Sequence, residues 1–207
     1  MNHNTSNGLF QLFEDIIDTE KEHQDKVTIW NNSNFSDIRL LEKNYVGNAG
    51  ERFIQETCNR VGIEANINGS KTKELGGGCG DGIINNRTVE IKTARQGASK
   101  AKSFQHELGE KPWLADFMVF VDISPLTIYL TMMPTMSEDQ YKKKGFKCGP
   151  YFPTKTTTWR KEEGAFKFDT SVNLNKKQSS VNQPHTIEIN ESTPIEEIRD
   201  FINRIVR

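Results

Sequence analysis

Apolar residues near the beginning of the chain recur at the spacing of an α-helix. Between Leu9 and Asp18 they occupy positions 9, 10, 12, 13, 16 and 17, which predicts an amphipathic helix. A second helix is predicted from Gly47 onward, where residues 53, 54, 57, 58 and 61 form one apolar stripe. Gly62 follows this stripe, and glycine is the preferred residue just after a helix C-terminus.

The pattern then changes to short runs that are typical of β-strands. The segment DGIINNRTVEIKT predicts a hairpin with Asn85-Asn86 as its turn, because asparagine tolerates positive φ. A helix is predicted after the hairpin, over about Ser99 to Leu108. Two continuous apolar runs, residues 115–123 and 127–134, have the length of strands and predict strands that are buried on both faces.

The C-terminal third predicts less regular structure before it ends in a strand and a helix. Residues 137–183 begin with a helix-like segment and continue as loops with one strand at 164–171. Residues 185–189 predict a further strand. No repeat or linker divides the chain, so residues 1–207 are interpreted as a single domain of the α/β class. The expected architecture is a central mixed β-sheet flanked by helices, with a loop- and strand-rich C-terminal third.

The final helix has a well-marked predicted beginning. Thr193 is the expected N-cap, Pro194 the first helical residue and Glu196 the partner of Thr193 in a capping box. The buried stripe predicted for this helix comprises Ile195, Ile198, Phe201 (or Ile202) and Ile205.

Composition narrows the possible classes of protein. No apolar stretch approaches the roughly 18 to 20 residues of a membrane span, and the N-terminus does not resemble a secretion signal. The expectation is therefore a cytoplasmic protein with no membrane partner. The three cysteines, Cys58, Cys79 and Cys148, are widely spaced and form no C-x-x-C motif, which argues against a disulfide framework or a structural zinc site.

The charge is unevenly distributed along the chain. The net charge of −1 argues against a protein that coats nucleic acid by bulk attraction. Residues 137–178, however, hold 10 Lys and Arg against 5 Asp and Glu, whereas residues 1–60 hold 6 against 10. The basic segment could be a solvated face, but it also permits local contacts with DNA phosphates.

The predicted hairpin brings together three side chains that could bind a metal ion and promote catalysis. With Asn85-Asn86 as the turn, Asp81 lies opposite Glu90, and opposed residues share one face of an antiparallel pair. Lys92, two residues farther along, returns to that face. Adjacent carboxylates repel each other unless a cation lies between them, and hard oxygen ligands suit Mg²⁺. Such an ion and a neighbouring ammonium can promote phosphodiester hydrolysis.

A simpler interpretation of the same residues remains open. The hairpin could lie on the surface, with Lys92 neutralising Glu90 in an ion pair. Against this, Glu90-Ile91-Lys92 is the only place in the chain where an acidic residue precedes a lysine by two positions.

The helix carrying Glu51, the segment G-D-G-x-x-N-x-R-x-V-E-I-K, and the predicted helix and apolar strand after it resemble the PD-(D/E)XK nuclease superfamily, over about residues 47–133. The resemblance implies a restriction-endonuclease-like fold, with Asp81 and Glu90 as Mg²⁺ ligands and Lys92 as the catalytic lysine. It also implies that the backbone carbonyl of Ile91 is a further metal ligand and that Glu51 completes the site, although Glu51 could instead be a solvated helix residue. One departure is Gly80, which stands where the family has proline.

Seven residues beyond the hairpin are candidates for contact with DNA. Arg95 and Gln96 follow the catalytic lysine directly, and two lysines follow in GASKAKS. The stretch TKTTTWRK, residues 154–161, combines Thr, Arg and Lys, which can contact base edges in a major groove. The candidates are Arg95, Gln96, Lys100, Lys102, Thr157, Arg160 and Lys161. His106 could act in proton transfer, although an isolated histidine on a helix is more often structural.

The resemblance is closest to type II restriction endonucleases, which implies Mg²⁺-dependent hydrolysis at a specific double-stranded DNA site that leaves 5′-phosphate ends. A homodimer is expected, because a two-fold dimer matches a palindromic site, with residues 137–183 serving recognition or dimerisation. No nucleotide cofactor is expected. The alternatives are a structure-specific nuclease, such as a junction resolvase or a nicking repair enzyme, and a non-catalytic DNA-binding module on a nuclease fold.

Overall fold

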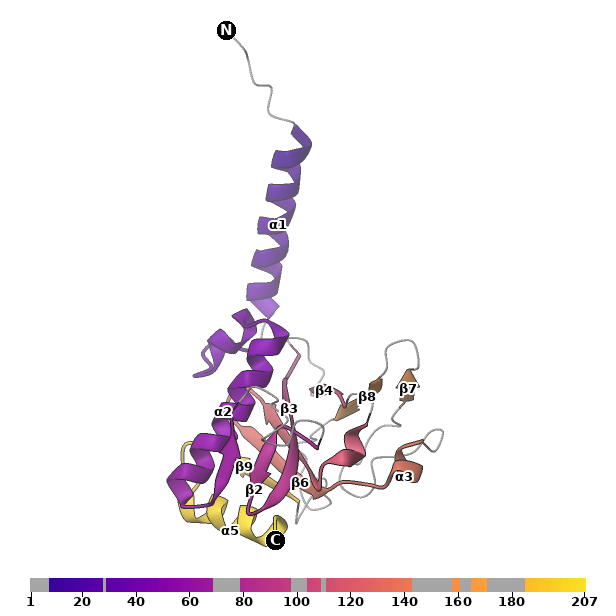
Figure 1. Cartoon of the computed structure of the whole chain (residues 1–207). Helices are drawn as coiled ribbons and strands as arrows, with labels where there is room; N and C mark the ends of the chain where they lie inside the picture. The colour runs from indigo at the N-terminus through magenta and orange to yellow at the C-terminus, as the bar shows by residue number, and fades with distance from the viewer. Residues whose placement is uncertain are drawn as a thin grey trace.

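The computed structural model describes residues 8–27, 29–68, 79–97, 104–108, 111–142, 158–160, 165–170 and 185–207. Its centre is a six-stranded sheet in the order β1-β2-β3-β5-β6-β9 (Figure 1). The strands are β1 (Ala65–Ile67), β2 (Gly82–Ile84), β3 (Arg87–Arg95), β5 (Phe117–Ile123), β6 (Ile128–Pro134) and β9 (Thr186–Ile189). Only β3 and β5 pair in parallel within this sheet, so the sheet is mixed.

The helices are α1 (Gly8–Val27), η1 (Ser36–Leu40), α2 (Lys43–Val61), η3 (Pro112–Leu114), α3 (Glu138–Lys142) and α5 (Ile195–Ile205). Helices α2 and α5 cover one face of the sheet. Ile54 on α2 and Ile202 on α5 are fully buried in one apolar cluster with Val89 and Val119 of the sheet. The predicted α/β class, with a central mixed sheet flanked by helices, is therefore confirmed.

The opposite face of the sheet is covered differently. Met118 and Phe120 of β5 pack there with Leu108 and Tyr141 in a second apolar cluster. A separate three-stranded sheet contains β4 (Phe104–Glu107), β8 (Ala165–Thr170) and β7 (Thr158–Arg160), in that order. Every residue of β5 is buried, as the uninterrupted apolar run predicts, because the strand is covered on both faces.

The two N-terminal helices agree with the periodicity but are longer than predicted. α1 continues to Val27 instead of ending near Asp18, and α2 begins at Lys43 instead of Gly47. Gly62 has the left-handed conformation at the end of α2, with φ of 71°. Glycine suits this C-terminal position because it has no Cβ that would oppose a positive φ.

The helix predicted over about Ser99 to Leu108 is wrong where the structure describes this segment. Residues 104–107 form β4, which pairs antiparallel with β8. Phe104 and His106 are buried whereas Gln105 and Glu107 are exposed, which is the period of two that a half-buried strand requires. Residues 99–103 lie outside the described residues.

The predicted capping box of the last helix is also wrong. The hydroxyl of Thr193 accepts a hydrogen bond from the Asn190 N–H at 3.0 Å and donates to the Glu188 carbonyl at 3.2 Å, so it stabilises the preceding turn. The helix therefore begins at Ile195, whose side chain is exposed. The buried stripe consists of Ile198, Phe201 and Ile202.

Two of the cysteines lie in the described residues, and both are free thiols. Cys58 is buried in the main apolar cluster, where burial raises the pKa of its thiol to about 11. Cys79 is exposed, and Cys148 lies outside the described residues. No helix in the described part of the chain has the length and apolar character needed to cross a membrane.

Candidate functional site

The β2–β3 hairpin has the predicted register. Gly82 pairs with Val89, Ile83 with Thr88 and Ile84 with Arg87. The turn residues Asn85 and Asn86 have φ of 47° and 60°, the positive values that a two-residue turn of this kind requires. The amide pair therefore determines which residues of the two strands face each other.

Asp81 lies directly before β2 and is 98% buried, with a relative exposure of 2%. Its backbone N–H donates to the Val89 carbonyl at 2.7 Å, which extends the hairpin pairing by one bond. Its carboxylate Oδ2 accepts a hydrogen bond from the backbone N–H of Ile91 at 2.8 Å. The Asp81 side chain thus occupies the position beside β3 at which β2 would have continued.

Two glycines allow the chain to approach β3 this closely. Gly80 has φ of 119°, and a Cβ at this position would lie 2.3 Å from the Val89 carbonyl oxygen. Proline has φ fixed near about −65° and could not adopt this conformation. A Cβ on Gly82 would lie 2.6 Å from the Asn66 carbonyl oxygen of β1. The segment Gly80-Asp81-Gly82 is therefore shaped by backbone contacts on both sides.

Glu90 and Lys92 project from the face of β3 opposite to Val89 and Ile91, because successive side chains of a strand alternate. The Lys92 Nζ and the Glu90 Oε1 form an ion pair. Each of the two side chains is 17% exposed. The site therefore combines two carboxylates and one ammonium around Ile91, with partial access to solvent.

The alternative of a surface hairpin is only partly consistent with these positions. The Glu90–Lys92 ion pair that it predicts is present. However, β3 is an internal strand that pairs with β2 on one side and with β5 on the other. Because β3 is internal and Asp81 is buried, the hairpin is part of the central sheet and not a surface element.

The backbone carbonyl of Ile91 points to the side of β3 on which Asp81 lies. The N–H and C=O of one strand residue point to the same side, and the Ile91 N–H points to Asp81. Gly82 is the first residue of β2, and it pairs with Val89, two residues before Ile91. The Ile91 carbonyl therefore faces the Asp81 side of β3, beyond the paired part of the hairpin.

Glu51 lies on α2 and is buried, with a relative exposure of 6%. Its neighbour Gly50 packs against Thr93 of β3, where a Cβ would lie 1.8 Å from the Thr93 Oγ1. α2 thus crosses β3 at close range just beyond Lys92. In the part of the chain that the structure describes, no three His, Cys, Asp or Glu side chains gather as a metal-binding group. Glu51 therefore stays a predicted participant only.

His106 forms a buried pair with Asp122, a residue that the sequence analysis did not single out. The His106 Nε2 and the Asp122 Oδ1 are 2.7 Å apart, with side chains 1% and 0% exposed. The His106 ring also packs edge-to-face on Phe120, with ring centroids 4.9 Å apart. Asp122 is the one charged residue in the apolar run FMVFVDI, and this interruption is the signal that could have identified it.

This buried pair lies on the same face of the sheet as Glu90 and Lys92. β3 and β5 pair in register, with Lys92 beside Phe120 and Ala94 beside Asp122. The pair joins β4 of the small sheet to β5 of the central sheet. It therefore fixes the position of β4 relative to the face that carries Glu90 and Lys92.

The predicted DNA contacts fall into two groups. Arg95 lies at the end of β3 and its guanidinium donates a hydrogen bond to the Ile38 carbonyl of η1. Gln96 is 8% exposed, and its backbone carbonyl accepts a hydrogen bond from Trp30 Nε1 at 3.3 Å. Both contacts connect β3 to the segment before α2, and a role of either residue on DNA stays a prediction. Lys100, Lys102, Thr157 and Lys161 lie outside the described residues, and for Arg160 only the backbone in β7 is described.

Comparison of the sequence with models of known protein families finds no match, and no curated protein matches it significantly.

Proposed function

We propose that the protein is a Mg²⁺-dependent DNA endonuclease, most similar to the type II restriction class. The observation that carries the proposal is the hydrogen bond between the Asp81 carboxylate and the backbone N–H of Ile91, the residue between Glu90 and Lys92. This bond holds a buried carboxylate beside the strand from which a second carboxylate and an ammonium project. Carboxylates and an ammonium in one place are the groups that metal-assisted hydrolysis of a phosphodiester needs.

The donor atoms fit Mg²⁺ in kind. Asp81 and Glu90 would supply carboxylate oxygens, and Ile91 would supply its backbone carbonyl, which faces Asp81. All of these are hard oxygen ligands, and protein Mg²⁺ sites commonly use only one or two carboxylates, with water and phosphate oxygens completing the shell. Two carboxylates and one carbonyl are therefore sufficient without a third acidic side chain. The bound ion would activate a water molecule and stabilise negative charge on the phosphate.

The protein groups would then position and neutralise the reacting atoms. Lys92 contacts Glu90 in the free protein. If Glu90 bound a cation, the cation would neutralise its carboxylate in place of Lys92. The Lys92 ammonium could then donate hydrogen bonds to a phosphate oxygen and to the attacking water. The backbone N–H of Ile91 keeps Asp81 oriented throughout the reaction. Glu51 is the candidate for a third acidic group at the site.

The proposed substrate is double-stranded DNA with a specific site, cut by a homodimer so that each subunit hydrolyses one strand and leaves a 5′-phosphate. The restriction-endonuclease-like character of the fold is part of this proposal. Arg95, Gln96, Lys100, Lys102, Thr157, Arg160 and Lys161 are the proposed DNA contacts.

The test is incubation of the purified protein with supercoiled plasmids and Mg²⁺, beside the Asp81→Asn and Lys92→Ala variants. Discrete linear bands from the wild-type protein alone would support the proposal. Lys111→Ala is the matched control, because Lys111 is exposed and far from the hairpin in sequence. Preferred cleavage of four-way junctions would favour a structure-specific nuclease. Binding without cleavage of any plasmid, in either Mg²⁺ or Mn²⁺, would favour a non-catalytic DNA-binding module.

A further inference from the structure

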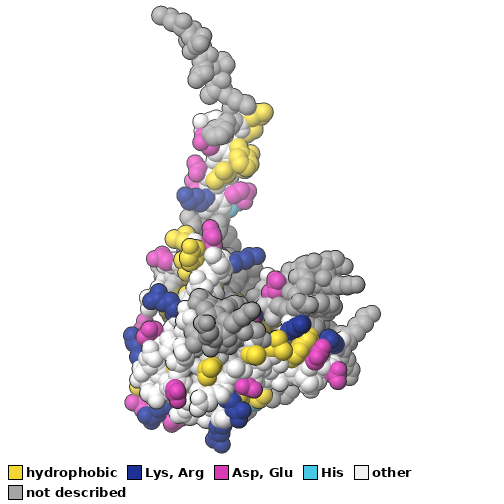
Figure 2. All heavy atoms as spheres, viewed as in Figure 1, with side chains coloured by type: hydrophobic (Ala, Val, Ile, Leu, Met, Phe, Trp, Pro, Cys, Tyr) yellow, Lys and Arg dark blue, Asp and Glu magenta, His cyan; other side chains and the backbone are white. Residues whose placement is uncertain are grey.

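Most of the exposed large apolar side chains in the described residues lie between positions 9 and 45. On α1, Leu12 is 53% exposed, Phe13 64%, Ile16 46% and Ile17 49%. Their spacing places them on one face of the helix. Figure 2 shows apolar side chains gathered along α1 and again near its base. A continuous apolar stripe of this kind on a surface helix is the side that normally packs against another element.

α1 projects away from the rest of the molecule (Figure 1). No other helix or strand in the described part of the chain packs extensively against it. In proteins most of the stability of a helix comes from packing of its apolar face, not from intrinsic helix propensity. The stripe of α1 therefore requires a partner surface.

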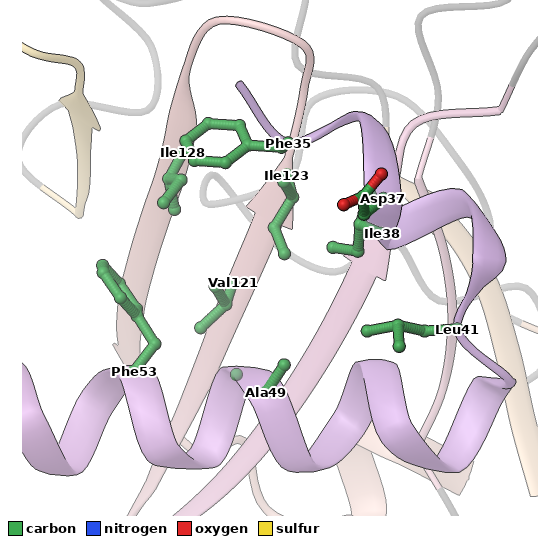
Figure 3. A pocket seen from close by; sticks show the side chains of 10 residues that line it. Phe35, Asp37, Ile38, Leu41, Ala49, Phe53, Val121, Ile123 and Ile128 are labelled. Carbon is green, nitrogen blue, oxygen red and sulfur yellow. The ribbon is translucent and has the colours of Figure 1, made fainter. Parts of the chain in front are cut away.

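The same chain carries an apolar pocket near the base of α1. The pocket has a volume of about 310 Å³ and lies between η1, α2 and the adjacent ends of β5 and β6 (Figure 3). Phe35 and Ile38 line one side, Phe53 lines the α2 side, and Ile123 and Ile128 form the floor from the sheet. Asp37 is the one charged residue of the lining that the structure describes.

Further exposed apolar residues lie on η1 and on the first turn of α2, two elements that also carry pocket-lining residues. Leu40 is 75% exposed and Tyr45 is 56% exposed. Leu41, which lies between them in the sequence, lines the pocket, and an apolar pocket of this kind can accept the apolar face of an amphipathic helix.

The stripe of α1 cannot reach the pocket of its own chain in the conformation observed. Phe13 lies 14 residues before Val27, the last residue of the helix. At a rise of about 1.5 Å per residue, Phe13 is roughly 21 Å along the helix from the end that joins the body. Because α1 points outward, this distance carries the stripe away from its own pocket and toward a neighbouring molecule.

We propose that α1 of one copy of this protein binds in the apolar pocket of a second copy, and that the second copy does the same in return. Stripe and pocket occur on every copy, so the reciprocal contact closes into a two-fold dimer. Each contact is made twice, which helps the interface to approach the total of about 1,600 Å² that is typical of stable complexes. The acidic residues Glu14, Asp15 and Asp18 point away from the stripe, so they can remain in water. This inference assigns an interface to the homodimer of the proposed function, but it does not depend on the nuclease activity, which plasmid cleavage tests separately.

The first experiment measures the oligomeric state of the full chain by sedimentation velocity. We expect a dimer, and we expect Ile16→Asp to weaken dimerisation at least about tenfold, because the change removes an apolar side chain from both contacts. Gln11→Asp is the control, since Gln11 is an exposed polar residue of the same helix, and its dimer should persist. A monomeric wild-type protein, or a dimer that Ile16→Asp does not weaken, would overturn the proposal.

The second experiment tests whether the helix binds the pocket or another α1. Ala49 lines the pocket from α2 and is exposed, so Ala49→Trp should fill the pocket and leave the core intact. Each variant alone, Ile16→Asp or Ala49→Trp, should be monomeric, because both of its contacts are damaged. A mixture of the two variants should form a heterodimer, because one undamaged helix then meets one undamaged pocket. A stable Ala49→Trp homodimer, or a mixture that stays monomeric, would rule out binding in the pocket.

Discussion

The carboxylate of Asp81 accepts a hydrogen bond from the backbone N–H of Ile91, with Oδ2 and N 2.8 Å apart. The Asp81 side chain thereby occupies the position beside β3 that a longer β2 would fill. The consequence is that a buried acid is held beside the residue that separates Glu90 from Lys92. This single contact links the backbone of the hairpin to the proposed chemistry.

The first prediction concerns Lys92. We expect Lys92→Ala to abolish detectable DNA cleavage while Mg²⁺ binding is kept or becomes tighter, because the Lys92 ammonium is bound to the proposed metal ligand Glu90 in the free protein. Isothermal titration calorimetry with Mg²⁺, on the wild-type protein and the variant, measures this difference. Lys111→Ala should leave both binding and cleavage unchanged. If Lys92→Ala removed Mg²⁺ binding, the proposed division of roles between Lys92 and the carboxylates would be wrong.

The buried His106–Asp122 pair predicts a large effect on stability. Asp122→Ala should lower the free energy of unfolding by about 3–5 kcal/mol, because it leaves His106 without its acidic partner in an apolar site. Urea denaturation measures the change, and Asp18→Ala, at an exposed position on α1, is the control. A loss below about 1 kcal/mol would show that the pair does not hold β4 against the central sheet.

Alanine substitutions of Gly80 in the hairpin and of Gly47 in α2 should have different effects on stability. Gly80→Ala is expected to destabilise the protein by at least about 1–3 kcal/mol, because φ is 119° there and a Cβ would meet the Val89 carbonyl. Gly47→Ala should be neutral or stabilise the protein by roughly 0.5–1 kcal/mol, since Gly47 lies within α2 and a Cβ would meet nothing within 4 Å. Urea denaturation of the two variants compares them. Equal effects of both substitutions would contradict the positive φ and the close backbone contact of Gly80.

Alkaline pH should weaken the fold through Cys58. Burial raises the pKa of this thiol from 9.0 in an unfolded chain to about 11. The folded state therefore retains the proton longer than the unfolded state, and the stability that this provides is complete below pH 9.0 and lost as pH rises toward 11. Unfolding free energies across this range should decline more steeply for the wild-type protein than for Cys58→Ala. Identical slopes would contradict the burial of the thiol.

The hairpin could be predicted from sequence because its determinants are local. Asn85 and Asn86 set the turn, and the turn sets the register that opposes the residues around Asp81 and Glu90. The limits of α1 and α2 were less accurate, because polar residues at their ends carry no periodic signal. The local sequence pattern is thus sufficient to predict the register of two strands that are joined by a two-residue turn.

Contacts between segments that are distant in the sequence could not be predicted from local patterns. The sequence predicts a helix where β4 lies because a strand of four residues gives a weak pattern, and its partner β8 lies about 60 residues away. The His106–Asp122 pair depends on that same placement of β4 over β5. The distance from Glu51 to the hairpin likewise depends on how α2 crosses the sheet, which residue spacing does not determine.

The most direct test of the central claim is the rate of plasmid cleavage as a function of Mg²⁺ concentration, for the wild-type protein and Asp81→Asn. The asparagine oxygen can still accept the Ile91 N–H, so the fold should be kept while one anionic metal ligand is lost. We predict Mg²⁺-dependent cleavage by the wild-type protein and a rate at least about 1,000-fold lower for Asp81→Asn at equal melting temperature. Cleavage by Asp81→Asn at the wild-type rate, or no Mg²⁺-dependent cleavage by either protein, would contradict the account.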